Sequence, residues 1–528
     1  MKVKRIIVVG GGTAGWLSAS FLSSQLPGIE VTIIASEKEP IVGVGESTVP
    51  QFRTFMEKMG VSEKTWMQAS GGSFKYGIEF NNWRTGSDRR WHGFGDFVTE
   101  KGITRSPDEF GKRQSVAHDD CVLMADYWIE LLKRGMITEE NYYQYASDTY
   151  HLAKNRRAHR DLDGHQYMSR VPGYAYHMNA WKVGQALKNL VALKNGVKLL
   201  ERHIVQVNHN EREEVVGVVD SNGETHVADL YFDCTGWKRL LIGPTTQWTS
   251  FKNRLPCNRA ISARIHYNND EEKFCYPFTR ATALSSGWSW SISLRDDIGS
   301  GYVYDSRFIS DDQAESEFRD HWAKQGKEID IQNRFDLNNG IVNQSAHRNV
   351  VACGLASNFL EPLEATSISF TTLAIELVVS ALKKHDNHWL DGEDRAISRL
   401  MSREVGHTGD FVWAHYALSQ RSDTEFWREI NRNRHVAIEM CHRWFCLDND
   451  DIYHREKDFG HTRYNKYDWA QMITSMRIWD GCPTRPITEA LLPRAELYYK
   501  HRDQMAKGVL DLVPTHWQLI KHINDHKS

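Results

Sequence analysis

The 528-residue sequence contains no run of about 20 apolar residues, which is the length that a membrane-spanning helix requires. It also lacks an excess of one charge, since 65 Lys and Arg residues stand against 68 Asp and Glu residues, a formal net charge of −3. Contact with a membrane or with nucleic acid is therefore not expected. Residues 5–16 read as a strand and a turn rather than as a signal peptide, which predicts a cytoplasmic protein.

Cysteine is scarce, with eight residues spread along the chain. The closest pair, Cys441 and Cys446, has no second pair at the spacing of a metal site. We therefore expect reduced, structural thiols, no disulfide and no bound metal. The hydrophobic residues (41%) and charged residues (25%) are in the proportion typical of a globular protein with a large core.

Large aromatic residues, in contrast, are plentiful, with 18 Trp, 20 Tyr and 21 Phe. Such side chains usually fill cores, and some of them can line a pocket for a flat ligand. Because no global charge selects a macromolecular partner, we expect the partner to be a small molecule.

A nucleotide-binding turn is predicted at the N-terminus. A β-branched strand at 5–9 leads into the motif GxGxxG at 10–15, which opens a helical segment and is followed by a second strand at 31–34. In such a unit the backbone N–H groups at the helix start can face a pyrophosphate. The candidate contacts are Gly10, Gly12, Thr13, Ala14 and Gly15. Ala35 occupies the usual place of the ribose-binding acid, so Glu37 is the candidate for that contact, with a solvated loop carboxylate as the alternative.

Two later segments favour FAD over NAD as the nucleotide. Residues 228–236, which end in DCTG, resemble the strand and turn that pass near the dinucleotide in FAD monooxygenase-like folds. Residues 350–354, followed by Pro362, resemble the later strand that leads to the flavin ring, where Gly354 and Leu355 are candidate contacts. The chain is thus expected to visit the nucleotide three times.

The pattern of strands and helices predicts an α/β fold. An FAD-binding Rossmann-like domain, of the FAD monooxygenase-like kind, is interleaved with an antiparallel-sheet substrate region and a helical C-terminal part. The predicted boundaries are 1–90, 181–255 and 346–385 for the FAD-binding segments, 91–180 for a helical insertion toward the substrate, 256–345 for the substrate sheet and 386–528 for the helical substrate-binding region. Apolar spacings of three and four predict late helices at 370–384, 395–417, 424–446 and 467–479.

Three further blocks point to one family. They are GVGESTVP at 43–50, FKYGI at 74–78 and FLEPLEATSI at 359–368. These blocks resemble those of the flavin-dependent tryptophan halogenases, and shorter stretches at 176–177, 301–304 and 415–427 support the likeness. The resemblance extends from the N-terminus to about residue 430.

The resemblance implies a catalytic pair, Lys75 and Glu364. Reduced FAD and oxygen would convert halide into hypohalous acid, and a lysine can hydrogen-bond this species or form a haloamine that directs the halogen to an aromatic carbon. Glu364 would position Lys75 or the electrophile, stabilise the cationic ring intermediate or take its proton, and the sequence leaves these roles open. The alternatives are a surface lysine and a carboxylate that caps a helix.

A halide site and a flavin strap are also implied by the resemblance. Backbone N–H groups of Thr366 and Ser367 are expected to hold the halide, although the family often has glycine in place of Ser367. Gly45, Glu46 and Ser47 belong to the expected strap over the flavin, with a plain turn as the alternative.

A tryptophan pair marks the expected barrier between substrate and flavin. The family motif WxWxIP, which discourages monooxygenation, is represented by Trp288 and Trp290, with Ser293 in place of the proline. One face of a core strand would also suit these side chains. His92 and Phe94 are candidates for an aromatic wall of the substrate pocket, with core packing as an equal alternative.

These observations predict a flavin-dependent halogenase that uses FAD and a halide ion and takes an indole- or phenol-like aromatic substrate, tryptophan among them. Since no second nucleotide motif for NAD(P)H is found, a separate flavin reductase is expected to supply reduced FAD. Two alternatives stay open: a two-component FAD monooxygenase, which Ser293 favours, and a flavin-binding protein without catalysis. Assembly into a homo-oligomer, the regiochemistry and the halide preference also stay open.

Overall fold

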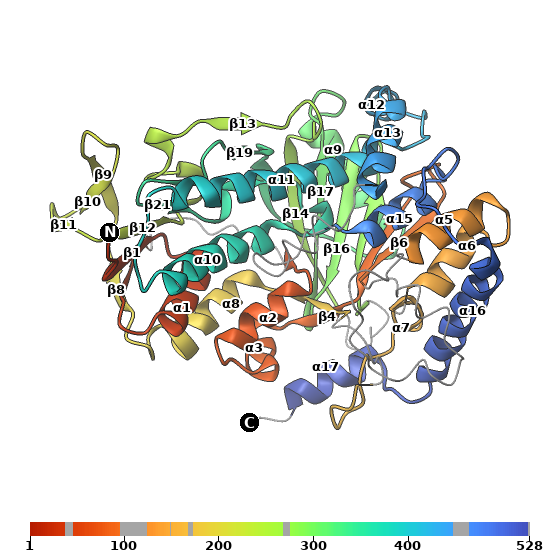
Figure 1. Ribbon diagram of the computed structural model, residues 1–528, viewed down its shortest axis with the longest axis horizontal. Coiled ribbons are helices and arrows are strands. Elements are labelled where there is room, and N and C mark those ends of the chain that lie inside the picture. Colours follow the sequence, from red (N-terminus) through yellow and green to blue (C-terminus); the bar gives the residue numbers. More distant parts are fainter. Residues whose placement is uncertain are drawn as a thin grey trace.

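The computed structural model describes residues 1–36, 46–94, 124–147, 149–166, 173–267, 275–446 and 464–525. Two larger β-sheets with helices packed around them give the molecule an elongated outline (Figure 1). A six-stranded sheet lies at the end that carries the N-terminus, and a seven-stranded sheet stands in the middle. In the part of the chain that is described, no helix combines the length and apolarity needed to cross a membrane.

The six-stranded sheet is assembled from three distant stretches of sequence. In spatial order its strands are β20 (Ala346–His347), β21 (Val350–Ala352), β12 (Leu230–Asp233), β1 (Arg5–Val9), β2 (Glu30–Ala35) and β8 (Lys198–Glu201). Neighbouring strands run parallel, apart from β20, which is antiparallel to β21. Parallel strands bring their carboxyl ends to one edge, so the turns after β1, β12 and β21 lie together.

One face of this sheet is covered by helices. The helix α1 (Thr13–Gln25) joins β1 to β2 and packs between α8 (Ala180–Leu187) and α10 (Ser367–Lys384). Residues 15–22 of α1 are all buried, because the sheet and both helices surround it.

The seven-stranded sheet divides the central core. Its strands are β18 (Asp330–Asp336), β14 (Arg259–His266), β17 (Asp297–Tyr304), β16 (Gly287–Ser293), β15 (Thr279–Ala283), β5 (Gly77–Asn81) and β6 (Arg89–Gly93). All neighbours are antiparallel except β5 and β15. On one face, side chains of β14 and β17 pack against α9 (Asp311–Ala323), and on the other face Trp288 and Trp290 enter the main core. Every residue of β16 is therefore buried.

Three small sheets complete the strands that the structure describes. They are β3 (Glu46–Ser47), β7 (Ala175–Met178) and β4 (Ser73–Lys75); β11 (Thr225–His226), β10 (Val215–Asp220) and β9 (Ile204–His209); and β13 (Trp248–Ser250), β19 (Gly340–Val342) and β22 (Asn358–Phe359). The first of them matters most for the site, since it joins residues 46–47 to Lys75 through β7.

Other helices cover the sheets and build the end opposite the N-terminus (Figure 1). They are α2 (Gln51–Lys58), α3 (Glu63–Ser70), α5 (Met124–Lys133), α6 (Glu139–Asn141), α7 (Tyr150–Lys154), α11 (Glu393–Ala417), α12 (Glu425–Ile430), α13 (Arg434–Cys446), α15 (Lys466–Ser475), α16 (Leu492–Val509) and α17 (His516–Asp525). A second apolar core lies where α5, α11, α13, α15 and α16 meet.

The predicted helix at 424–446 is wrong as a single element, because the chain forms α12 and α13 with a break between them. At the break, the side-chain amide of Asn431 donates to the carbonyl oxygens of Ser419, over 3.1 Å, and Arg421, over 2.8 Å. These bonds tie the end of α12 to the chain after α11. Such a tertiary contact overrides the local helical pattern.

Candidate active site

The turn between β1 and α1 allows the backbone to approach a ligand closely. Gly10 has φ +118°, and a Cβ placed on it would lie 2.2 Å from the carbonyl oxygen of Cys234. A Cβ on Gly15 would lie 1.9 Å from the carbonyl oxygen of Gly10. Both positions therefore require glycine. At Gly12 an added Cβ would meet no described atom within 4 Å, so the space in front of the helix is open to a phosphate group.

The third segment of the sheet meets this turn. Gly354 has φ +64° and begins a short turn that includes Leu355, and a Cβ on Gly354 would lie 2.9 Å from the Cβ of Ala14. Thr13 opens α1, which has no side-chain hydrogen bond at its N-cap. The first N–H groups of α1 are thus left for an anion, and the site fits a dinucleotide.

The predicted flavin strap is described only in part. Gly45 lies outside the described residues, and so does Glu37, the candidate ribose contact. Glu46 and Ser47 form β3, where the hydroxyl of Ser47 lies 3.2 Å from the hydroxyl of Thr279. Burial raises the pKa of Glu46 to about 7, so a large fraction of this carboxyl group is neutral near neutral pH.

Lys75, at the end of β4, is fully buried. Its ammonium donates to the carbonyl oxygen of Thr48 over 3.2 Å and lies 5.2 Å from the centre of the Phe94 ring. Burial lowers the pKa of Lys75 to about 7, although the charge of Glu364 opposes this change. A large fraction of Lys75 is therefore the neutral, nucleophilic amine near neutral pH.

Glu364 closes the short turn Pro362–Glu364 and is also buried. Its Oε1 accepts a hydrogen bond from Nε2 of His415 over 2.9 Å, and both of its oxygens lie 3.1 Å from Nδ1 of His92. Burial alone would raise the pKa of Glu364, but the charge of His92 and the hydrogen bond from His415 hold it well below its usual range. Glu364 is therefore a carboxylate.

The two histidines on Glu364 differ in charge. His92 lies between two carboxylates, since its Nε2 is 3.2 Å from Oδ1 of Asp468 in α15, so both ring nitrogens donate. Burial opposes this charge, yet Glu364 and Asp468 raise the pKa of His92 to about 10. His415 accepts at Nδ1 from the guanidinium of Arg90 over 3.4 Å, and burial lowers its pKa to about 4. The site thus holds one imidazolium and one neutral imidazole.

Sequence reasoning missed three members of this network. It assigned no role to Arg90, His415 or Asp468, and it proposed His92 only as part of an aromatic wall. The ring of His92 does lie beside Phe411, with 5.3 Å between ring centres, but its polar contacts are with the carboxylates. One usable signal was present, because a buried histidine in the apolar stretch of α11 requires a polar partner.

The predicted halide contacts lie at the start of α10. Thr366 is the N-cap of this 18-residue helix and Ser367 is its first residue, and no side chain caps the helix. The N–H groups of the first turn have no partner within a helix, and the positive end of the helix dipole favours an anion. A halide at this position remains a prediction.

The tryptophan pair lies on β16. The ring centres of Trp288 and Trp290 are 6.3 Å apart, and Gly301 of β17 makes room for Trp290, since a Cβ there would lie 2.0 Å from Cη2 of the indole. Ser293, in the position of the family proline, accepts a hydrogen bond at its hydroxyl from the N–H of Tyr276 over 3.2 Å. The pair belongs to the main core, and its role as a barrier remains a prediction.

The sequence profile described as tryptophan halogenase matches residues 5–485. The chain belongs to the tryptophan halogenase family. It is 32% identical over 450 residues to the tryptophan 7-halogenase RebH of Lentzea aerocolonigenes, which covers 83% of this chain and 81% of that protein. Its structure superposes on a tryptophan 6-halogenase of Streptomyces toxytricini with a TM-score of 0.82 at 26% identity, over 98% of this chain and 100% of the other. A flavin-dependent halogenase of Xanthomonas campestris gives a TM-score of 0.77 at 25% identity, over 99% and 98% of the two chains.

These similarities confirm the predicted family and the predicted α/β fold class. The protein is therefore an enzyme of the halogenase class. Membership of the family implies the use of FAD and halide, and the glycine turn described above fits the dinucleotide.

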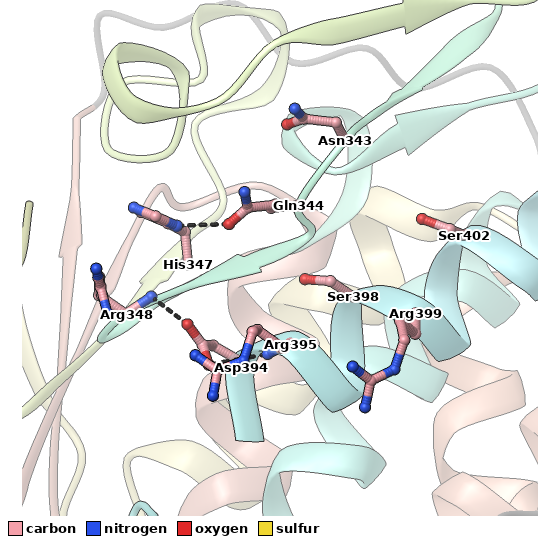
Figure 2. Close-up of a pocket in the computed structure, with 9 residues that line it drawn as sticks. All are labelled: Asn343, Gln344, His347, Arg348, Asp394, Arg395, Ser398, Arg399 and Ser402. Atoms are coloured by element: carbon pink, nitrogen blue, oxygen red, sulfur yellow. Dashed lines mark hydrogen bonds between the residues drawn. The ribbon is translucent and has the colours of Figure 1, made fainter. Parts of the chain in front are cut away.

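A hollow on another part of this halogenase has a different chemical character (Figure 2). It encloses about 550 Å³ between β20 and α11, and it is lined by Asn343, Gln344, His347, Arg348, Asp394, Arg395, Ser398, Arg399 and Ser402. This lining includes no Phe, Tyr or Trp and none of the predicted site residues. The hollow therefore does not match the pocket expected for a flat aromatic substrate.

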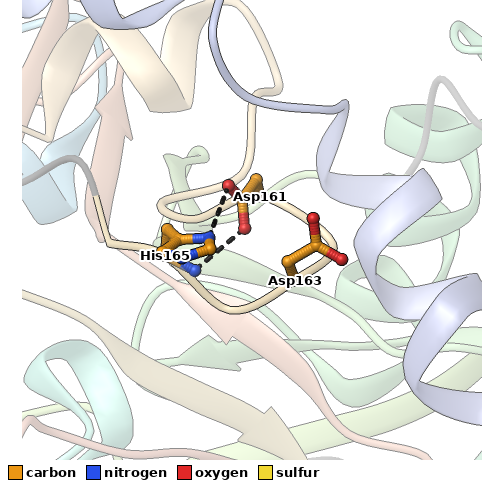
Figure 3. Close-up of side chains that lie close together, drawn as sticks. All are labelled: Asp161, Asp163 and His165. Atoms are coloured by element: carbon orange, nitrogen blue, oxygen red, sulfur yellow. Dashed lines mark hydrogen bonds and ion pairs between the residues drawn. The ribbon is translucent and has the colours of Figure 1, made fainter.

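Among the residues that the structure describes, two groups of side chains bring potential metal ligands within 4.8 Å of one another: Asp161, Asp163 and His165 (Figure 3), and Asp220, Glu224 and His226. Asp161 accepts hydrogen bonds from the N–H of His165, over 2.8 Å, and from its ring, over 3.2 Å. Asp220 accepts from the backbone of Asn222, over 2.8 Å, and of Glu224, over 3.1 Å. These bonds close local turns, which accounts for both groups without a metal.

Proposed function

We propose that this halogenase uses reduced FAD, oxygen and halide to make hypohalous acid, and that Lys75 delivers the halogen to an electron-rich aromatic substrate. Reduced FAD, when bound, would supply two electrons to oxygen and halide would supply the other two, so that reduced FAD, oxygen, halide and a proton give oxidised FAD, hypohalous acid and water. The substrate is an indole or a phenol, and tryptophan, for which the relatives above are named, is one candidate. The observation that carries the proposal is the burial of Lys75 within range of the charge of Glu364, which is itself buried and ionised.

The chemistry of Lys75 follows from its burial. The neutral amine attacks the halogen of hypohalous acid, so that an N–halogen bond forms and water leaves. Attack by the aromatic carbon then forms the C–halogen bond and breaks the N–halogen bond, and the ring proton passes to the nitrogen that the halogen leaves, which restores the amine. In its ammonium form, Lys75 instead holds the hypohalous acid by a hydrogen bond, and burial keeps the electrophile from water in both cases.

Among the roles left open for Glu364, the surroundings favour electrostatic stabilisation. Both carboxylate oxygens already accept hydrogen bonds from histidines, and the low pKa makes Glu364 a weak base. A fixed carboxylate lowers the energy of the cationic ring that forms when the halogen is added. We therefore assign Glu364 to that charge rather than to removal of the proton.

The remaining assignments rest on the family resemblance together with position. Backbone N–H groups of Thr366 and Ser367 hold the halide, Trp288 and Trp290 separate the substrate from the flavin, and His92 and Phe94 flank the substrate. Residues 46–47 form part of the strap over the flavin. A separate flavin reductase supplies the reduced FAD, because no second nucleotide motif is found in the sequence.

A second candidate function is hydroxylation of the aromatic substrate by the same bound cofactor. Ser293 favours it, because the family proline that follows the tryptophan pair is missing. Ser293 nevertheless keeps β16 in place through its bond with Tyr276, so the substitution leaves the local strand ordered.

The test is mass spectrometry of products from a panel of indoles and phenols, supplied with FAD, a flavin reductase, NADH, oxygen and bromide. We expect a bromine isotope doublet from the wild type and none from Lys75→Met, whereas Lys324→Met, at an exposed lysine after α9, should match the wild type. Both variants should bind FAD and consume oxygen. Products that gain only oxygen would favour the monooxygenase, and brominated product from Lys75→Met would refute the role of Lys75.

A further inference from the structure

Glu361, three residues before Glu364, is another buried glutamate, and it lies outside the proposed catalytic pair. Its side chain is 0% exposed. Its backbone N–H donates over 2.8 Å to Oδ1 of Asn339, whose amide nitrogen donates to the carbonyl oxygens of Leu255 and Cys257. The backbone of Glu361 is therefore held firmly, and its carboxyl group must lie inside the core.

The carboxyl group of Glu361 faces two polar groups on different elements. These are the indole nitrogen of Trp288 in β16 and the hydroxyl of Tyr416 in α11. Neither carboxyl oxygen has a hydrogen-bond partner in good geometry among the described residues, and the indole N–H of Trp288 also has none. The hydroxyl of Tyr416 lies 3.6 Å from the thiol of Cys257. These donors and acceptors are therefore buried together, where each of them needs a hydrogen-bond partner.

Neighbouring residues link this cluster to the active site. Tyr416 directly follows His415, which donates to Glu364 over 2.9 Å. Glu361 and Glu364 stand at the two ends of one short turn, and Tyr416 and His415 are consecutive residues of α11. The turn therefore meets α11 at two points, Glu361 with Tyr416 and Glu364 with His415, and Glu364 belongs to the proposed site.

We propose that Glu361 is a positioning residue that joins Trp288 of β16 to Tyr416 of α11 and so fixes the turn that carries Glu364. The proposal rests on the proposed function, in which Glu364 stabilises the reacting ring. Glu361 touches neither the cofactor nor the substrate in this scheme. It acts by setting the distance between Glu364 and His415.

The carboxyl group has to be neutral for this role. Burial raises the pKa of Glu361 to about 8, although Tyr416 and Trp288 lower it. The groups that interact with it are Tyr416, Trp288 and Cys257, and the charges of Asp305 and Arg307 act on the thiol of Cys257. A neutral acid has one O–H to donate and one oxygen that accepts, which suits a hydroxyl on one side and an indole N–H on the other.

The first test is thermal unfolding of the wild type and of Glu361→Gln between pH 5 and 8, which needs no halogenation assay. In the wild type, Glu361 ionises above pH 4.5 in the unfolded chain but stays neutral in the folded one, so Tm falls as pH rises toward 8. The Gln variant lacks this loss, so it should melt like the wild type at pH 5 and several degrees higher at pH 8. Equal pH dependence of Tm in the two proteins would overturn the proposal.

The second test is turnover by Glu361→Gln and Glu361→Leu, with Glu404→Leu as the matched control. Glu404 is a buried glutamate nearer the start of α11, with one oxygen unpartnered among the described residues. We expect kcat to fall at least tenfold in Glu361→Leu, with KM and FAD affinity unchanged. The kcat of Glu361→Gln should stay within about threefold of the wild-type value, and Glu404→Leu should keep the wild-type kcat.

The outcomes of the second test are separable from the proposed function. Wild-type kcat in Glu361→Leu, or the same loss in Glu404→Leu, would overturn the positioning role. If the wild type itself gives no halogenated product, the proposed function fails, and the melting experiment still decides whether Glu361 is the neutral link between Trp288 and Tyr416.

Discussion

Replacement of Lys75 by methionine should make the protein more stable while it removes halogenation. The pKa of Lys75 falls from 10.5 in the unfolded chain to about 7 in the folded protein, because the ammonium is buried. At about 1.4 kcal/mol per pKa unit, this difference destabilises the folded state by about 5 kcal/mol at or below pH 7. Loss of the hydrogen bond to Thr48 costs the variant about 1 kcal/mol, so the unfolding free energy of Lys75→Met should exceed that of the wild type by about 4 kcal/mol at pH 6.

The lowered pKa of Lys75 also determines how the stability of the wild type depends on pH. Between pH 7 and 10.5 the unfolded chain holds a proton that folded Lys75 has lost, so the wild type becomes more stable as pH rises. The advantage of Lys75→Met should therefore shrink to about 1 kcal/mol at pH 9. Urea unfolding of both proteins at pH 6, 7.5 and 9 measures this difference in stability, with Lys324→Met as the control. A Lys75→Met protein that is less stable than the wild type at pH 6, or equally shifted at every pH, would refute the buried, low-pKa amine.

Two further predictions follow from the site. The pKa of His92 is raised to about 10, so its charge adds stability that is complete below pH 6.5 and is lost as pH rises toward 10. The loss of unfolding free energy in His92→Asn, measured by urea unfolding, should therefore be largest near pH 6 and small near pH 10. A loss that grows with pH would contradict the imidazolium. Gly12→Ala should weaken FAD binding at least tenfold without loss of Tm, because its added Cβ meets only the open space before α1. Gly406→Ala, inside α11 with equally free space, should raise stability by about 0.5–1 kcal/mol and leave FAD titrations unchanged. Equal FAD affinity in Gly12→Ala and the wild type would place the dinucleotide elsewhere.

Local sequence patterns predicted the parts of the fold that depend on local interactions. The strand at 5–9, the glycine turn and the following helix are consecutive, and the backbone contacts that require glycine at Gly10 and Gly15 fall at positions that the motif spacing already indicates. The strand pattern around Trp288 was likewise readable, because residues that alternate along β16 share one face. The domain boundaries remain predictions.

The polar network around Glu364 could not be derived from local pattern. His92 and Glu364 are 272 residues apart, and His415 reaches Glu364 only because α11 packs beside the turn. The pairing of Lys75 with Glu364 came from the family resemblance and not from spacing. Charges such as those of His92 and Asp468 depend on burial and on partners from other elements, which no window of sequence contains.

The order of strands in the six-stranded sheet has a consequence for synthesis of the chain. β1 lies in the interior of the sheet, and its edge toward β12 cannot be covered until residue 233 has been made, long after β2 has covered the other edge. At about 5–20 residues per second, translation leaves the backbone N–H and C=O groups of this edge unpaired for about 10–40 s. During that interval the nascent chain presents an open strand edge to its neighbours, so the yield of folded enzyme should depend on chaperone capacity and on the speed of translation between β2 and β12.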